Sequence, residues 1–157
     1  GICNRCQLMA ELELLYPEHE VKHKMVHNDS HKFESGFVGL EIPKNNSIML
    51  GSLSGTKLGV WIAHGEGKFS FPYEEKEYNV IAKYNYDGYP ANPNGSPYSV
   101  AGVCSKDGRH LAMMPHPERA IFPWQCGYYP NDRKENDQVT PWIEAFVNAR
   151  KWIETHA

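Results

Sequence analysis

The sequence predicts an α/β fold in which a mixed, mostly antiparallel sheet is flanked by helices. Three observations lead to this prediction. A tight turn opens a helix near the N-terminus, several segments of strand length follow it, and an amphipathic helix closes the chain. With 157 residues, of which 41% are hydrophobic and 22% charged, the chain is long enough for one domain with a full core.

The opening helix is predicted over residues 4–16. Apolar side chains recur there at three- and four-residue spacing from Leu8 to Leu15, and Pro17 ends the run. The Asp107-Gly108 pair predicts a tight turn between the last two strands, which therefore form a hairpin. Strands are predicted at residues 36–42, 57–64, 67–73, 77–86, 99–105 and 109–115.

The closing helix has a clear start signal, because Thr140 can cap it and Pro141 suits its first turn. We expect irregular loops at residues 87–97, which are rich in Gly, Pro and Asn, and at residues 123–139. The apolar face of the closing helix is predicted to comprise Trp142, Phe146, Ala149 and Ile153.

Composition excludes several classes of protein. The net charge is −3 and the Lys and Arg residues are scattered among Asp and Glu, so there is no basic field for nucleic acid. No apolar stretch approaches the roughly 20 residues that span a membrane, and no secretion signal is visible. We therefore expect a cytoplasmic protein with reduced thiols at its four cysteines, Cys3, Cys6, Cys104 and Cys126.

The turn before the first helix carries the first chemical signal. Cys3 stands where a strand would turn sharply into a helix, which is the setting of a nucleophile elbow. A helix N-terminus favours a thiolate, and the N–H of the next residue, Asn4, can donate to an oxyanion. The alternative is that Cys3 is only a small buried residue.

The second signal is a histidine between two prolines, at Pro115-His116-Pro117. The prolines stiffen the backbone around the imidazole, and Glu118 can accept its Nδ1 proton and fix the tautomer. The alternative is a histidine in an ordinary turn at the end of a strand. Together, Cys3, His116 and Glu118 suggest a catalytic triad.

These motifs resemble those of a known family. Gly-x-Cys-x-x-x-Gln at residues 1–7 and His-Pro-Glu at 116–118 look like the class I, or triad, glutamine amidotransferases. Residues 63–67 (Ala-His-Gly-Glu-Gly), 92–96 (Asn-Pro-Asn-Gly-Ser) and 115–119 resemble more narrowly the glutaminase domain of the phosphoribosylformylglycinamidine synthase family. The resemblance covers essentially the whole chain and favours the large single-chain form of that family.

The resemblance implies a role for each matching residue. Cys3 is expected to be the nucleophile that forms a thioester, His116 the general acid and base, and Glu118 its orienting partner. Gln7 would face the substrate pocket. His64, Gly65 and Glu66 match the segment that binds the amino and carboxylate end of glutamine. The Asn94-Gly95-Ser96 loop is a family marker without an assigned role.

The resemblance also implies what the domain works with. Ammonia from glutamine would supply an ATP-dependent amidination in purine biosynthesis, carried out by a synthetase domain of the same polypeptide. We expect ATP and Mg²⁺ in that synthetase part, and neither a cofactor nor a metal within these residues.

The sequence departs from the family pattern in two places. Arg5 stands where the family has a glycine, and we expect it to distort the elbow or block the pocket, unless its charge lowers the pKa of Cys3. The glycine-rich loop that supplies a second oxyanion donor upstream is absent, as is the strand leading to the elbow. We therefore expect an N-terminally truncated fragment that hydrolyses glutamine poorly, since one donor contributes roughly 100- to 1000-fold.

Three other readings remain open. Cys3-x-x-Cys6 matches a redox or zinc half-site, but no second pair follows at close spacing. The domain could instead be a catalytically impaired docking module of the synthase. The third reading is a metal-binding stripe on a helix, although turn signals favour a solvated segment there; its histidines are His19, His23, His27 and His31.

Overall fold

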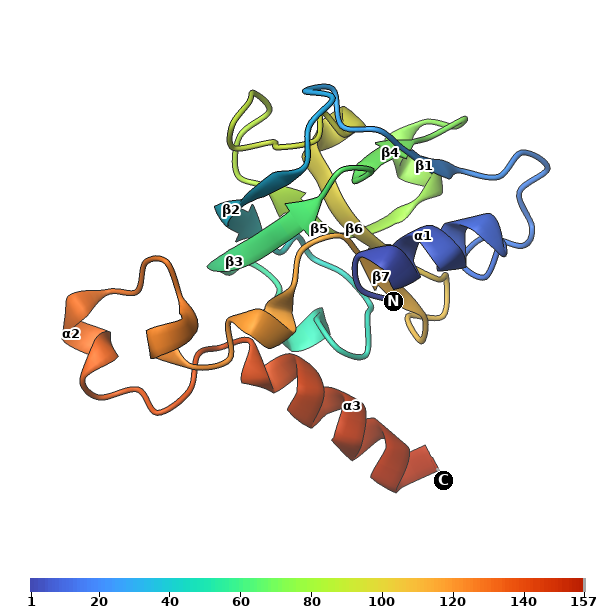
Figure 1. The fold of residues 1–157 in the computed structure, drawn as a ribbon. Coiled ribbons are helices and arrows are strands. Elements are labelled where there is room, and N and C mark those ends of the chain that lie inside the picture. The colour runs from blue at the N-terminus through green and yellow to red at the C-terminus, as the bar shows by residue number, and fades with distance from the viewer. Residues whose placement is uncertain (157) are drawn as a thin grey trace.

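The computed structural model describes residues 1–156, and the predicted helices and strands occur in the predicted order, with a strand at 24–26 and a helix at 131–134 in addition (Figure 1). The α-helices are α1 (Asn4–Glu11), α2 (Asn131–Lys134) and α3 (Ile143–His156). The strands are β1 (Lys24–Val26), β2 (Glu34–Glu41), β3 (Lys57–His64), β4 (Lys68–Ser70), β5 (Asn79–Tyr84), β6 (Val100–Cys104) and β7 (Leu111–Met113). Short 3-10 turns occur at Gly51–Leu53, Glu75–Glu77, Pro97–Ser99, Pro117–Arg119 and Pro123–Gln125.

The main sheet has five strands in the order β3-β2-β5-β6-β7, and every neighbouring pair is antiparallel. A parallel element is added at the β7 edge, where Ile2 bridges Met113. Strands β1 and β4 form a separate two-stranded antiparallel sheet. The α/β class and the mixed sheet flanked by helices are thus confirmed, with the parallel pairing confined to the residues that lead into the elbow.

The core lies on both faces of the main sheet. Successive residues of β7 alternate between the two sides: Ala112 packs on the side of α1, whereas Leu111 and Met113 pack on the side that receives Trp142. This period-two pattern explains why both hairpin strands are entirely buried, as strands covered on two faces must be.

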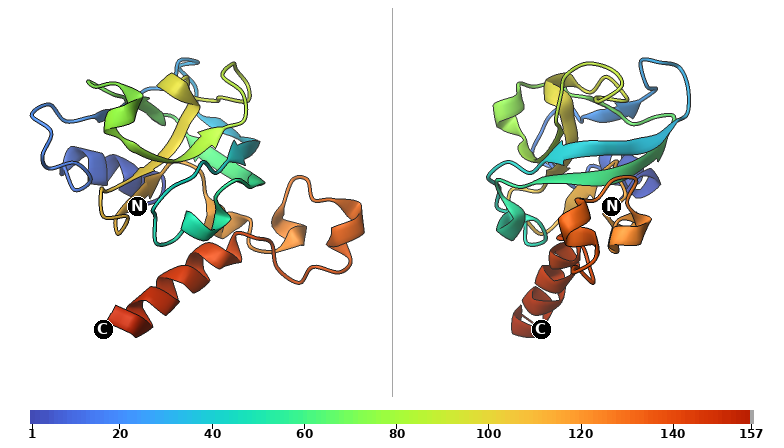
Figure 2. Two further views of the ribbon diagram at one scale, coloured as in Figure 1. Left: turned by 180° about the vertical axis from the view of Figure 1, so that it is seen from behind. Right: turned by 90° about the vertical axis from the view of Figure 1, so that its left-hand side faces the viewer.

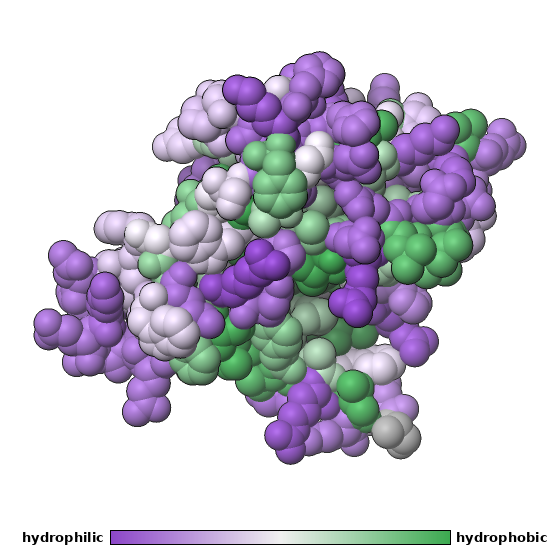
Figure 3. Space-filling model, viewed as in Figure 1, coloured by the Kyte–Doolittle hydropathy of each residue, from purple (hydrophilic) through white to green (hydrophobic). Residues whose placement is uncertain are grey.

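Helix α1 is shorter than predicted. It ends at Glu11, and Glu13 adopts a φ of 55°, which turns the chain so that Leu15 is buried beyond the helix. Cys6 and Ala10, four residues apart, form its buried face. Leu8 and Leu12 are more than half exposed, and apolar atoms gather on the surface over α1 in Figure 3.

The start of α3 is as predicted, because the Trp142 N–H donates to Thr140 Oγ1 at 3.3 Å. Its buried face is partly different. Trp142 and Ala145 are buried, but Phe146 and Ile153 are exposed because α3 extends away from the sheet after its first turns (Figures 1 and 2). The helix therefore covers the sheet edge with its N-terminal part only.

Two loops lie at the predicted places. Residues 87–97 connect β5 to β6, and residues 123–139 form an excursion beside the sheet that contains the one-turn helix α2 (Figure 2). No helix among residues 1–156 combines the length and apolar character needed to cross a membrane.

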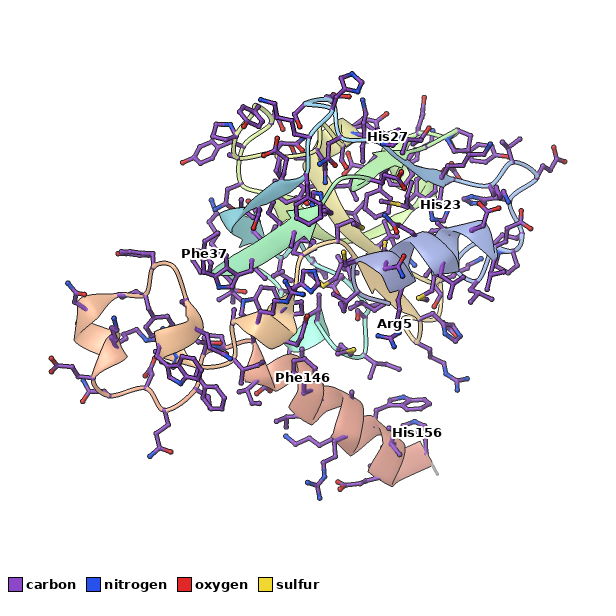
Figure 4. The ribbon with its side chains drawn as sticks, in the orientation of Figure 1. Arg5, His23, His27, Phe37, Phe146 and His156 are labelled. Atoms are coloured by element: carbon purple, nitrogen blue, oxygen red, sulfur yellow. The ribbon has the colours of Figure 1, made fainter. Side chains whose placement is uncertain are left out.

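The histidine-rich segment was predicted to be solvated, and this is wrong for His23. His23, labelled in Figure 4, is 2% exposed. Its ring packs with those of Phe69, Phe71 and Tyr78. Short-range turn signals do not reveal this burial, because the covering rings come from β4 and from the segment before β5.

Trp142 is the anchor of α3, since its ring is buried and its Nε1–H donates to Gly59 O at 2.8 Å. We expect Trp142→Ala to lower the free energy of unfolding by about 3–5 kcal/mol, as for other buried aromatic truncations. Trp124→Ala, at a 74% exposed ring, is the matched control and should change it by less than about 0.5 kcal/mol. Urea denaturation measures both, and equal effects would refute the assignment of the anchor.

Burial, reinforced by neighbouring His19, lowers the pKa of His23 to about 4. In the unfolded chain the ring has a pKa near 6.5 and binds a proton at pH values where the folded ring stays neutral. The free energy of unfolding therefore falls as pH drops from about 6.5 to 4. We expect His23→Phe to remove about 2 kcal/mol of the stability lost between pH 7 and pH 5. Phe71→Leu, which perturbs the same cluster without a titrating group, should shift stability equally at both pH values in urea titrations.

Candidate active site

Cys3 occupies a strained elbow between sheet and helix. Its backbone has φ 52° and ψ −112°, a conformation that non-glycine residues adopt at a cost of about 1–3 kcal/mol and keep at functional sites. Its N–H donates to Met113 O at 2.9 Å, while its carbonyl accepts from Cys6 N at 2.8 Å within the first turn of α1. The elbow thus joins the β7 edge directly to a helix N-terminus, as the sequence predicted.

The local charges on the Cys3 thiol oppose each other. Burial raises its pKa, whereas the Asn4 backbone N–H and then the Arg119 guanidinium lower it, and Glu118 raises it again; the net pKa lies above the usual value. The thiol is therefore protonated at neutral pH and needs a base to become a nucleophile. The backbone N–H of Asn4 interacts with the Cys3 sulfur. This is the N–H that was predicted to donate to an oxyanion.

His116 and Glu118 form the second half of the site. The Nδ1–H of His116 donates to Glu118 Oε1 at 2.6 Å, and the 3-10 turn Pro117–Arg119 holds both side chains. Within residues 1–156, the buried Nε2 of His116 has no hydrogen-bond partner. The imidazole is thus oriented by a carboxylate on one nitrogen and open on the other, which is the arrangement of a general base.

The end of β3 brings the two halves together. Trp61 O accepts the backbone N–H of His116 at 2.8 Å, and Ala63 O accepts the Cys3 thiol at 3.5 Å. Glu118 and Arg119 both act on the pKa of Cys3, so the triad candidates from residues 3 and 116–118 lie close together, where the end of β3 meets the residues that follow β7. Cys3 and His116 are more than 100 residues apart in the sequence, and the folding of the sheet brings them near each other.

The predicted substrate-binding residues lie in α1 and at the end of β3. Gln7, one turn into α1, donates from Nε2 to Glu66 O at 2.8 Å, so the helix and the segment 64–67 are tied together. The side chain of Glu66 lies 3.5 Å from that of His27 at the surface. His64 is buried, and within residues 1–156 neither of its ring nitrogens has a partner. Burial lowers the pKa of His64 to about 4, so the ring is neutral at pH 7.

Arg5 does not distort the elbow. A Cβ at Gly1 would lie 2.7 Å from Arg5 O, so the close approach of strand and helix backbones is made by Gly1, and residue 5 carries its side chain outward. The exposed Arg5 points toward the α3 side (Figure 4), where it lines a cavity of about 620 Å³ with Glu118 and Phe146. Arg119, and not Arg5, is the cation that lowers the pKa of Cys3.

The four cysteines are free. Cys6 is fully buried on α1, and burial raises its pKa to about 12, so it packs as an apolar residue. Among residues 1–156, no group of three or more His, Cys, Asp or Glu side chains is arranged to hold a metal ion. The Cys-x-x-Cys half-site therefore has no completing ligands in this part of the chain.

Three residues near the site carried no chemical signal in the sequence. Arg119 was noted only as part of a family motif, Asn28 only as part of a turn, and Asn94 only as a family marker. Asn28 and Asn94 are completely buried and hydrogen-bond the segment 64–67. A buried asparagine in a loop would have been the signal, but burial is a tertiary property that a local pattern does not encode.

A strained cysteine at a strand-to-helix turn, with a carboxylate-oriented histidine beside the same end of β3, is typical of a cysteine-dependent amidotransferase domain. The family model described as CobB/CobQ-like glutamine amidotransferase domain matches residues 1–153. This chain belongs to that glutamine amidotransferase family.

Similar proteins indicate the branch of this family that the chain resembles. The chain is 43% identical over 175 residues to the probable phosphoribosylformylglycinamidine synthase, chloroplastic/mitochondrial, of Arabidopsis thaliana, covering 99% of this chain and 12% of that protein. It is 38% identical over 178 residues to the phosphoribosylformylglycinamidine synthase of Homo sapiens, covering 97% and 13%. The chain thus spans about an eighth of these relatives.

A solved structure shares the fold. The structure of PurLQS from Thermotoga maritima matches with a TM-score of 0.73 and 27% identity, over 98% of this chain and 60% of that one. The predicted resemblance to the glutaminase part of this synthase family is therefore confirmed.

The effect of Arg119 on the pKa of Cys3 can be tested with Arg5 as the control. Arg119→Gln removes a cation that stabilises the thiolate, so the pKa of Cys3 should rise and its alkylation by iodoacetamide at pH 7.5 should slow by a few-fold. Arg5→Gln, at another exposed arginine, in the first turn of α1, should leave the rate unchanged. Alkylation is located at Cys3 by mass spectrometry, and a larger effect from Arg5 would reverse our assignment.

Proposed function

We propose that this chain hydrolyses glutamine to glutamate and ammonia through Cys3, His116 and Glu118. The observation that carries the proposal is the φ of 52° at Cys3, because strain is kept at a position only where the surrounding structure enforces it, commonly for function. The Glu118-oriented imidazole of His116 supports the same assignment.

The reaction follows from the charges of the site. His116 Nε2 takes the Cys3 proton as the sulfur attacks the amide carbon of glutamine, and the Asn4 N–H donates to the oxyanion that forms. His116 then protonates the departing ammonia, leaving a γ-glutamyl thioester on Cys3. Water, deprotonated by the same imidazole, attacks the thioester, so glutamate leaves and the thiol is restored.

We assign substrate binding to Gln7 and to the segment at the end of β3. Gln7 and the backbone of Gly65 and Glu66 would hold the amino and carboxylate end of glutamine. The N–H groups of Gly65 and Glu66 donate no hydrogen bond within residues 1–156, which suits them to a carboxylate. His64, neutral at pH 7, lines the same region without adding a charge.

The ammonia would serve the reaction named in the relatives, ATP-dependent conversion of formylglycinamide ribonucleotide to formylglycinamidine ribonucleotide in purine biosynthesis. The small share of each relative that the chain covers supports a partnership with a synthetase part, which would bind ATP and Mg²⁺. Four free cysteines fit a reducing compartment, and we propose the cytoplasm. Among residues 1–156 only the Asn4 N–H is assigned to the oxyanion, so turnover by this chain alone should be slow.

The direct test is covalent labelling by a glutamine-mimicking chloroketone, because labelling needs the pocket and the nucleophile but not turnover. We expect one adduct, at Cys3, and excess glutamine should prevent it. Cys3→Ala should abolish the adduct, while Cys126→Ala, which removes another partly exposed free thiol, should leave it intact.

The opposite result is equally clear. If the chloroketone spares Cys3 while iodoacetamide modifies it, the thiol is accessible but the glutamine pocket is not formed. The chain would then be a docking module that descends from an amidotransferase.

A further inference from the structure

The segment that follows β3 has all its carbonyl oxygens engaged. Residues 64–67 comprise the last residue of β3 and the three that follow it, and each of their four carbonyls accepts a hydrogen bond from another part of the chain. The donors are Asn28 Nδ2 to His64 O (2.8 Å), Asn28 N to Gly65 O (2.9 Å), Gln7 Nε2 to Glu66 O (2.8 Å) and Asn94 Nδ2 to Gly67 O (2.8 Å).

Asn28 grips both ends of this segment. Its Nδ2 donates to His64 O and to Lys32 O, and its Oδ1 accepts the Gly67 N–H at 2.9 Å. The side chain is completely buried, so these bonds are protected from water. One amide thus sets the distance between the first and last residues of the segment.

Asn94 holds the segment from the opposite side. Its Nδ2 donates to Gly67 O and to the buried Tyr84 hydroxyl at 3.1 Å. Its Oδ1 accepts both the N–H and the hydroxyl of Ser96 at 3.0 and 2.7 Å. All the hydrogen-bonding capacity of this buried amide is therefore used, which makes its position unique.

The two asparagines belong to one block. Asp29 N donates to Asn94 O at 3.2 Å, which joins the corner at residues 28–29 to the loop at 92–96. At Gly95, whose φ is 78°, a Cβ would lie 2.0 Å from the Asp29 carboxylate. The positive φ strains any other residue there, and an added Cβ would also displace the flexible Asp29 side chain.

We propose that Asn28 and Asn94 are positioning residues of the glutaminase site: they fix residues 64–67 so that only the N–H groups of Gly65 and Glu66 remain free for the substrate. This inference rests on the proposed function. A segment with every carbonyl engaged and its donors open offers a fixed set of N–H groups to a carboxylate. The loop at 92–96 acts on the substrate through Asn94 and the segment it holds.

The decisive variants are Asn28→Asp and Asn94→Asp, which keep the shape of each side chain but remove its N–H donors. The carbonyls of His64 and Gly67 then face a carboxylate oxygen. We expect the chloroketone rate at Cys3 to fall roughly tenfold or more, with glutamine protecting less well, because an unmade buried hydrogen bond costs about a factor of ten. The iodoacetamide rate at Cys3 should stay within about twofold.

Hydrogen exchange of the His64 and Gly67 amides, which unlike those of Gly65 and Glu66 are not left open, gives a second readout that does not depend on glutamine chemistry. Both variants should speed exchange in this segment and leave β6 and β7 as in the wild type. The matched control is Asn79→Asp, since Asn79 Nδ2 also donates to a backbone carbonyl, Ser105 O at 3.1 Å, away from the site. It should change neither the ratio of the two labelling rates nor the exchange of residues 64–67.

Gly95→Ala provides a milder variant if either aspartate variant does not fold. Its Cβ displaces the half-exposed Asp29 side chain next to Asn28, and we expect a few-fold loss of the chloroketone rate alone. An unchanged ratio of the chloroketone and iodoacetamide rates in folded variants overturns the inference. If the wild-type chain takes no chloroketone at Cys3, the proposed function fails. Faster exchange of residues 64–67 in the two aspartate variants would still establish that Asn28 and Asn94 fix this segment.

Discussion

The backbone strain at Cys3 is the constraint on which the rest of the site depends. A non-glycine residue at φ 52° is stable only if its neighbours leave it no alternative. Here Met113 O holds its N–H, Gly1 admits the helix backbone at close range, and Cys6 and Ala10 bury the following turns. The packing of α1 on β7 therefore supplies the energy that keeps the thiol at the helix N-terminus.

Strand β3 is the common reference for the other parts. Three of its carbonyls accept hydrogen bonds from different partners: Trp61 O from the His116 backbone N–H, Ala63 O from the Cys3 thiol, and His64 O from Asn28 Nδ2. Because all three belong to one extended segment, a shift of β3 would move base, nucleophile and substrate segment together. The distances between these three parts of the site are therefore preserved, because all of them are bound to the same strand.

The sequence predicted the parts of the fold that local chemistry determines. The β6–β7 hairpin follows from an Asp-Gly turn, β3 from its apolar run, and the start of α3 from Thr140. The end of α1 was wrong because burial of Leu15 outweighs helical periodicity. His23 and Asn28 were missed for the same reason: their roles are created by strands distant in sequence, and neither the spacing nor the composition near them reports those contacts.

The elevated pKa of Cys3 bears on how the proposed reaction starts. A thiolate formed in advance by a helix N-terminus and a nearby cation would show a lowered pKa, but burial outweighs both the Asn4 N–H and Arg119 here. In the proposed reaction the proton therefore leaves the sulfur during the attack, and the unpartnered Nε2 of His116 is the proposed acceptor. Entry of glutamine, by placing its carbonyl against the Asn4 N–H, would couple binding to that transfer. A thiol that stays protonated until substrate arrives is also protected from alkylation and oxidation while the site is empty.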